Sequence, residues 1–165
     1  MYLVCSTHPY LAYAVFKVAR SVAKPTSDWN SVKRILRCLR GTSELRLFYT
    51  SSGGKLCAYA DADFAGNTKT RRSTNGFVSV IGDMALLWTP QLQKSVALST
   101  TEVEFVVASE GARDKVLFYF VRELYQNGDI NVEYICSENH HGDIFTKPLK
   151  SNKFKAMCTK IGLRN

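Results

Sequence analysis

The sequence predicts an α/β fold, in which one small antiparallel sheet is covered by helices. Three strand-like runs lie close together at residues 55–63, 76–81 and 84–88, with short polar connections between them. Apolar residues at helical spacing follow over residues 99–124, and two further helical patterns precede the strands. We therefore expect three antiparallel strands, a long helix after them and an N-terminal helical segment.

The two N-terminal helical patterns have recognisable starts and ends. Pro9 suits the first turn of one helix, and Pro25 ends it. Ser27 or Asp28 can cap the second helix, which Gly41 closes. Its apolar stripe consists of Trp29, Val32, Leu36 and Leu39, and its other face carries Lys33, Arg37 and Arg40. This basic face can follow the phosphates of a nucleic acid or simply face solvent, and the residues leave both interpretations open.

Positive charge is concentrated in the first third of the 165-residue chain. Residues 1–55 contain nine Lys or Arg and two Asp or Glu, so +7 of the formal net charge of +8 lies there. Such an excess indicates a polyanionic partner such as nucleic acid.

The five cysteines form no Cys-x-x-Cys pair, and no apolar run approaches the ~20 residues of a membrane span. We expect an intracellular protein, in the cytoplasm or nucleus, without a membrane partner.

Composition divides the chain into three parts. Residues 45–49 alternate as a short strand, and the Ser-Ser-Gly-Gly run at 51–54 is a flexible joint and the best candidate boundary. We expect a helical, basic segment over residues 1–53 and a second domain over 54–149. The second domain contains a further strand pattern at 131–135, followed by a loop or helix start at 139–143. The basic tail, 150–165, has apolar residues at helical spacing: Phe154, Met157 and Ile161.

Two carboxylates, Asp61 and Asp63, fall on one face of the first predicted strand, just before Gly66. Like charges held this close repel, so a fold places them at a cation site or at an exposed edge. On this motif alone we favour a solvent-facing strand end, because Asp-x-Asp before a turn is common. Motifs further along the chain reverse that preference.

The start of the predicted long helix holds two glutamates with different expected roles. Ser99 with Glu102, and Thr101 with Glu104, both have the spacing of a capping box. Glu102 and Glu104 are two residues apart and therefore point to different sides of a helix. One of them can cap the helix while the other faces the sheet.

Four motifs follow one another in a fixed order. They are Tyr-Ala-Asp-Ala-Asp-Phe-Ala-Gly at 59–66, Thr-Arg-Arg-Ser-Thr-Asn-Gly at 70–76, Ser-Val-Ala-Leu-Ser-Thr-Thr-Glu-Val-Glu-Phe at 95–105 and Gly-Asp-Ile-Phe-Thr-Lys-Pro-Leu at 142–149. In this order they resemble the ribonuclease H domain at the end of the Pol polyprotein of copia-type retrotransposons. Residues 5–9 and 29–42 resemble the segment that connects reverse transcriptase to that domain. The resemblance covers nearly the whole chain.

The resemblance implies a ribonuclease H-like mixed sheet and a nuclease that cuts the RNA strand of an RNA–DNA hybrid. Enzymes of this family hold two Mg²⁺ ions, which Mn²⁺ can replace, about 4 Å apart between carboxylates. Asp61 matches the first-strand aspartate of the family, Glu104 the helix glutamate and Asp143 the last aspartate. The reverse transcriptase part of the same polyprotein is an expected partner. Contacts to nucleic acid are expected from Arg71, Arg72, Ser73, Asn75 and Lys94.

One part of the family pattern is missing. After the long helix the family has another strand, which bears an Asp-Asn pair, and then another helix; here Tyr125-Gln126 leads almost directly into Asn127-Gly128. The second-strand metal ligand therefore has no counterpart, and we expect weakened Mg²⁺ binding and a weak or inactive nuclease. We also hypothesise that the strand at 131–135 fills the vacancy and pairs in parallel with the Asp61 strand.

A second class of function stays open, namely a catalytically inactive remnant that binds nucleic acid or protein through the same surface. Mg²⁺-dependent cleavage of a hybrid separates the two.

His140 and His141 could contact a metal near Asp143, although adjacent histidines in loops are more often just exposed. A virus-like particle is a further expected location if the chain belongs to an active element.

Overall fold

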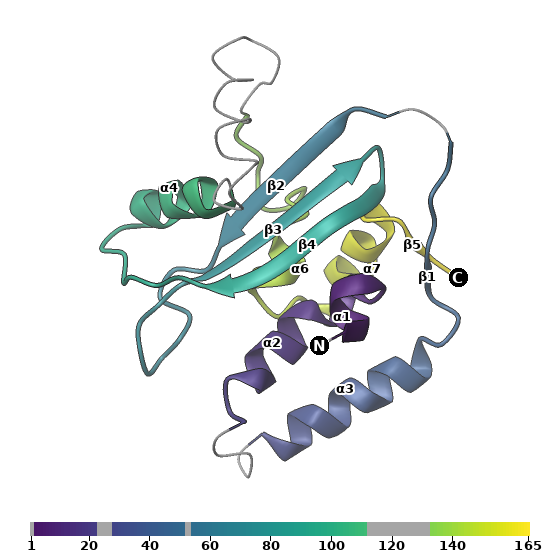
Figure 1. Ribbon diagram of the computed structural model, residues 1–165, viewed down its shortest axis with the longest axis horizontal. Helices are drawn as coiled ribbons and strands as arrows, with labels where there is room; N and C mark the ends of the chain where they lie inside the picture. The colour runs from purple at the N-terminus through teal and green to yellow at the C-terminus, as the bar shows by residue number, and fades with distance from the viewer. Residues whose placement is uncertain (1, 23–27, 52–53, 112–132) are drawn as a thin grey trace.

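The computed structural model describes residues 2–22, 28–51, 54–111 and 133–165. Its centre is an antiparallel sheet with the strand order β2-β3-β4, formed by Leu56–Ala62, Thr74–Ile81 and Met84–Leu92 (Figure 1). Nearly every residue of β3 is buried, and successive side chains of a strand point to opposite faces, so both faces of the central strand are covered. The prediction of three antiparallel strands is confirmed.

The third strand runs further than the sequence predicts. We expect it to end before Pro90, whereas β4 continues to Leu92 and Pro90 lies opposite Gly76. Within the described residues β4 is an edge strand, and an edge strand can hold a proline because one of its sides makes no ladder hydrogen bonds. The short connection predicted between the second and third strands is a turn at Gly82, whose φ of 59° is a conformation that glycine adopts readily.

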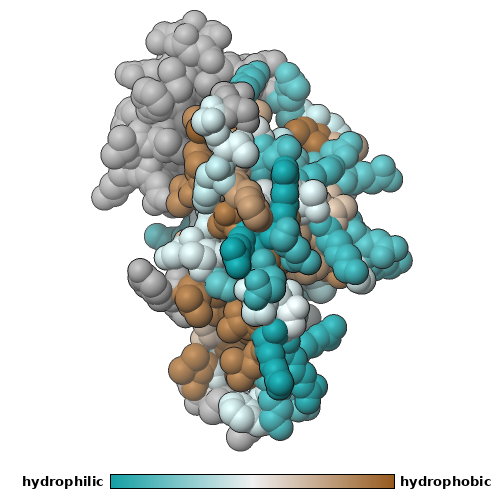
Figure 2. Space-filling model, turned by 90° about the vertical axis from the view of Figure 1, so that its right-hand side faces the viewer, coloured by the Kyte–Doolittle hydropathy of each residue, from teal (hydrophilic) through white to brown (hydrophobic). Residues whose placement is uncertain are grey.

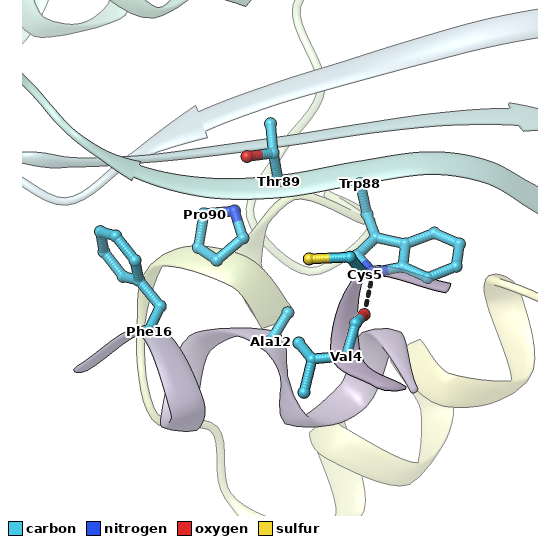
Figure 3. A pocket seen from close by; sticks show the side chains of 7 residues that line it. All are labelled: Val4, Cys5, Ala12, Phe16, Trp88, Thr89 and Pro90. Atoms are coloured by element: carbon cyan, nitrogen blue, oxygen red, sulfur yellow. Dashed lines mark hydrogen bonds between the residues drawn. The ribbon is translucent and has the colours of Figure 1, made fainter. Parts of the chain in front are cut away.

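The N-terminal helices pack against the edge strand β4. Helix α1 spans Tyr2–Ser6, the 3-10 helix η1 Pro9–Leu11 and α2 Ala12–Ala19. Figure 3 shows side chains from α1 and α2 facing β4 around a small pocket lined by Val4, Cys5, Ala12, Phe16, Trp88, Thr89 and Pro90. The Trp88 indole N–H donates a hydrogen bond of 2.7 Å to the Val4 carbonyl oxygen, so the buried indole ties the N-terminal helices to the sheet.

The buried core also draws on the C-terminal residues. Helices α6, Asp143–Thr146, and α7, Ser151–Lys160, lie beside the sheet, and β5, Leu163–Arg164, pairs antiparallel with β1, Arg46–Leu47 (Figure 1). The helical spacing noted for residues 154–161 is realised in α7. The core residues come from all three of the segments into which composition divides the chain, and include Tyr10, Leu11, Val78, Trp88, Phe145, Met157, Ile161 and Leu163.

Helices α3 and α4 lie where the sequence places them. Helix α3 spans Trp29–Gly41 and has no fully buried residue. Helix α4, Thr100–Gly111, begins with the predicted capping box, because the Glu102 backbone N–H donates to Ser99 Oγ at 3.1 Å. The Glu102 carboxylate in turn accepts a 2.8 Å hydrogen bond from the Leu98 backbone N–H. The predicted continuation of this helix to residue 124 lies outside the described residues.

The predicted parallel strand is wrong in the part that the structure describes. Residues 133–135 adopt no strand, and the described ladder of β2 is formed with β3 alone. Tyr134 is 89% exposed, so this segment has no buried side chain that would hold it against the sheet. Residues 131 and 132 lie outside the described residues. None of the described helices is both long enough and apolar enough to cross a membrane.

Candidate functional site

Asp61 lies near the end of β2, where α6 approaches the sheet closely. It stands opposite Gly76 of β3, and a Cβ atom on Gly76 would come within 2.6 Å of Thr146 Cγ2. A Cβ on Gly142 would lie 2.8 Å from Asp61 Cβ. Both distances are too short for real contacts, so these two glycines allow the start of α6 to reach the Asp61 strand.

Asp143 is the first residue of α6, and its side chain is completely buried. The Lys153 ammonium donates to Asp143 Oδ2 at 2.5 Å, and Lys147 Nζ lies 2.7 Å from Oδ1. Burial by itself would raise the pKa of Asp143, but the two ammonium groups outweigh burial and lower it. Asp143 is therefore a buried carboxylate that stays ionised because two cations neutralise it.

Asp61 is held by the same end of α6. The buried Thr146 hydroxyl donates a hydrogen bond to Asp61 Oδ2, and Lys147 Nζ lies 3.5 Å from the same oxygen. Lys147 thus stands between the two carboxylates. Burial would lower the pKa of Lys147, but Asp143 and Asp61 outweigh burial and raise it, so the ammonium keeps its charge.

His140 completes a group of three side chains that could hold a metal ion. One ligand atom each of Asp61, His140 and Asp143 lies within 4.8 Å of the other two. The Gly142 backbone N–H donates to His140 Nδ1 at 3.1 Å, so the neutral ring carries its proton on Nε2. In this arrangement neither nitrogen offers a free lone pair, and His140 would have to turn or change tautomer to bind a metal.

His141 packs against the sheet instead of the carboxylates. Its ring centroid lies 4.0 Å from that of Tyr59. Burial, together with the positive charge of Lys160 and the neighbouring His140, lowers the pKa of His141 to about 4. The ring is therefore neutral at physiological pH and acts as part of the packing around β2.

The other predicted acids do not join this group. Glu104 is exposed on α4 and is not among the ligand atoms that meet within 4.8 Å in the described residues. Asp63 accepts a hydrogen bond from the Thr74 backbone N–H and packs against Gly66, where a Cβ would overlap its carboxylate. Asp63 therefore shapes the connection between β2 and β3.

The predicted contacts to nucleic acid divide by exposure. Arg71, Arg72 and Lys94 are exposed. Ser73 and Asn75 are buried: Ser73 Oγ accepts a 3.0 Å hydrogen bond from the Ala65 backbone N–H, and Asn75 Oδ1 accepts one of 2.7 Å from Gln93. Ser73 therefore supports the loop between β2 and β3, and Asn75 holds Gln93 just after β4.

Sequence reasoning missed three residues of the site, namely Thr146, Lys147 and Lys153. One signal was readable, because Lys147 follows Asp143 by four residues and opposite charges at that spacing meet on a helix. The Thr146 and Lys153 contacts depend on how α6 packs on β2 and how α7 follows it, which no local pattern indicates.

The fold and the site define an α/β protein in which two carboxylates from distant parts of the chain meet at the end of a sheet strand. No protein-family model and no solved structure matches the chain. The retrovirus-related Pol polyprotein from transposon TNT 1-94 of Nicotiana tabacum is 40% identical, over 100% of this chain and 16% of the polyprotein. The corresponding polyprotein from transposon RE2 of Arabidopsis thaliana is 28% identical, over 95% of this chain and 14% of its own length.

The chain belongs to the family of retrovirus-related Pol polyproteins of copia-type transposons, and it spans only about a seventh to a sixth of the length of these two relatives. Secreted RxLR effector protein 161 of Plasmopara viticola is also similar, with 38% identity over 70% of this chain and 83% of the effector. The two Pol polyproteins confirm the transposon origin that the four motifs indicate.

The alignment with the tobacco polyprotein also bears on the internal gap. It extends over 209 positions, whereas the chain has 165 residues, so at least 44 positions of the polyprotein have no counterpart here. This difference supports the prediction that the chain lacks a segment which its relatives contain.

Proposed function

We propose that the chain is a ribonuclease H-like domain, with the preceding connecting segment, that binds RNA–DNA hybrids and has lost most of its nuclease activity. The observation that carries the proposal is the meeting of Asp61 and Asp143 within a 4.8 Å group, although 82 residues separate them in the chain. Family membership supports the same assignment, because both residues fall in the motifs that resemble a ribonuclease H domain.

The carboxylates present fit one Mg²⁺ ion, or Mn²⁺ in its place. Asp61 and Asp143 supply hard oxygen ligands of the kind that Mg²⁺ prefers, and Thr146 orients Asp61 through its hydroxyl. Divalent ions in a hydrolytic site supply an activated water and stabilise the leaving oxygen. In the described residues no further carboxylate joins the pair, since Glu104 is exposed on α4. A second ion would therefore be weakly held, and this is the basis of the proposed impairment.

Exposed cations provide the surface for a hybrid. Arg71 and Arg72 lie in the loop between β2 and β3, and Lys94 follows β4. Exposed arginine and lysine side chains suit phosphate contacts. Hydrophilic side chains also predominate on the face seen in Figure 2, which views the molecule from the side of β1 and β5, away from the loop between β2 and β3. The reverse transcriptase part of a polyprotein is a further proposed partner. Cytoplasm, nucleus or a virus-like particle are the proposed locations.

A cleavage assay tests this proposal. The chain is incubated with a labelled RNA–DNA hybrid in Mg²⁺ and, separately, in Mn²⁺, beside Asp61→Asn and a remote control, Glu44→Gln, which changes an exposed carboxylate. We expect hybrid binding with cleavage that is slow or absent, and any residual cleavage should disappear in Asp61→Asn but persist in Glu44→Gln. Rapid cleavage that depends on Asp61 contradicts the impairment, and absence of hybrid binding contradicts the whole proposal.

The pairing of both carboxylates with lysine favours a second candidate function, a hybrid-binding module without catalysis. Lys147 and Lys153 neutralise the carboxylates that a nuclease would use for metal ions. Under this alternative, hybrid binding weakens steeply with added salt, and divalent ions leave both binding and the RNA strand unchanged.

A further inference from the structure

We infer that Lys147 and Lys153 act as internal cations that occupy the carboxylate site, so that a divalent ion must displace an ammonium group in order to bind. This inference rests on the proposed divalent-ion site at Asp61 and Asp143. The inference adds that two lysines of the chain itself compete with a divalent ion for the carboxylates, and that this competition sets how tightly the site binds metal.

The contacts leave little of Asp143 free. Lys147 Nζ lies 2.7 Å from Oδ1, and Lys153 Nζ lies 2.5 Å from Oδ2 and 2.7 Å from the Ser137 carbonyl oxygen. Lys147 also lies 3.5 Å from Asp61 Oδ2. Two carboxylates therefore meet two ammonium groups, and their formal charges cancel without a metal ion.

Burial makes this pairing necessary in the metal-free protein. The Asp143 side chain is 1% exposed and that of Asp61 17%, so an unpaired charge on Asp143 would be strongly destabilising. The two lysine side chains are 37% and 32% exposed. Each can swing its charged end into water on a flexible stem, which makes displacement by a divalent ion physically accessible.

The two lysines are unequal competitors. Lys147 contacts both carboxylates and stands where an ion bridging Asp61 and Asp143 would have to lie. Lys153 contacts Asp143 alone and also holds the Ser137 carbonyl, so it ties α7 to the segment before α6. We therefore expect Lys147 to have the larger effect on metal affinity and Lys153 the larger effect on the attachment of α7.

The test compares Mn²⁺ binding and thermal stability in Lys147→Met, Lys153→Met and a matched control, Lys155→Met, an exposed lysine on α7. Mn²⁺ alone is titrated and the free ion is measured by electron paramagnetic resonance. We expect Lys147→Met to bind Mn²⁺ more tightly than the unchanged chain because the competing ammonium is gone, by roughly tenfold if the effect is as large as other changes next to metal ligands. Its melting temperature without metal should fall, and saturating Mn²⁺ should restore it.

Two further variants make the result decisive. Lys147→Arg keeps the positive charge and should retain the weak Mn²⁺ binding of the unchanged chain. Asp61→Asn combined with Lys147→Met should lose the gain in affinity. A purely structural ion pair predicts instead that Lys147→Met lowers the melting temperature and leaves Mn²⁺ affinity unchanged, and that outcome overturns the inference.

The design also separates this inference from the proposed function. Hybrid binding in the absence of metal reports on the proposed function, whereas the change in Mn²⁺ affinity reports on the lysines. Tight hybrid binding with equal Mn²⁺ affinity in all variants overturns only the inference. Tighter Mn²⁺ binding by Lys147→Met without any hybrid binding overturns only the proposed function. If Mn²⁺ binds to none of the variants, there is no site to compete for and the inference fails.

Discussion

His141 shows how the environment of one side chain changes its chemistry. Its pKa falls from 6.5 to about 4, chiefly because the ring is buried against Tyr59. The unfolded chain therefore binds one more proton than the folded chain between these two values. Above pH 6.5 the ring is neutral in both states, and His141 leaves the full stability of the folded chain in place. As the pH falls from 6.5 toward 4, the unfolded chain takes up the proton first, so the free energy of unfolding decreases.

We predict that the free energy of unfolding decreases between pH 7 and pH 5, and that His141→Gln makes this decrease smaller. Urea unfolding at several pH values provides the measurement. Asp143 does not account for this decrease, because Lys147 and Lys153 lower its pKa and its contribution is therefore lost only in more acidic solution. The same pH dependence in His141→Gln would show that another group is responsible.

At the residue scale, the site could be predicted only in part. Asp61 and Asp143 stand in sequence motifs, and the structure brings them together. Glu104 stands in an equally clear motif, yet it is exposed on α4 and outside the described ligand group. Motifs identify which acids belong to the family pattern, but the position of a helix on the sheet decides which of them meet.

The contact between α6 and β3 depends on the absence of a side chain at one glycine. A Cβ on Gly76 would lie 2.6 Å from Thr146 Cγ2 and 2.9 Å from the Gly142 carbonyl oxygen. Backbone atoms at that distance cannot move aside without shifting α6 from the sheet. Because Thr146 and Asp143 belong to α6, such a shift would also disturb the carboxylate pair.

We predict that Gly76→Ala lowers the free energy of unfolding by about 1–3 kcal/mol, the usual cost of overpacking. Gly41→Ala is the matched control, since nothing lies within 4 Å of a Cβ there and the residue ends α3. That change should be neutral or slightly stabilising. Urea unfolding measures both variants, and equal stabilities would show that α6 adjusts to the extra methyl group.

At the element scale, periodicity predicted the sheet strands and the helices α3, α4 and α7. Helix α7 buries a face, α4 begins with a capping box, and α3 packs only partly buried side chains such as Ile35 and Leu39 against the core. The strand predicted at 131–135 is absent in the described residues 133–135. Its alternating pattern would bury one face, but Tyr134 is exposed. The ladder between β1 and β5 was also missed. Each strand has two residues, and 116 positions separate Leu47 from its partner Leu163, so no local pattern connects them.

At the scale of the whole molecule, the uneven charge is the property that most directly concerns function. Helix α3 carries Lys33, Arg34, Arg37 and Arg40, all exposed, and contains no acidic residue. In the part of the chain that the structure describes, none of these four forms an ion pair. The sequence leaves open whether this face follows phosphates or only faces solvent. The structure adds that the four cations are exposed, with Lys33 Nζ 5.8 Å from the centroid of the Trp29 ring.

We predict that this face contributes to hybrid binding. Replacing Lys33 and Arg37 by alanine should reduce the magnitude of the slope of log affinity against log salt by roughly 2, because each phosphate contact contributes nearly one unit. A control with the same loss of charge replaces Lys150 and Lys155, which are exposed in the C-terminal segment and should leave the slope unchanged. Fluorescence anisotropy with a labelled hybrid at several salt concentrations measures both. If the α3 variant keeps the slope of the unchanged chain, the basic face of α3 is solvated surface, and other exposed cations such as Arg71, Arg72 and Lys94 must account for binding.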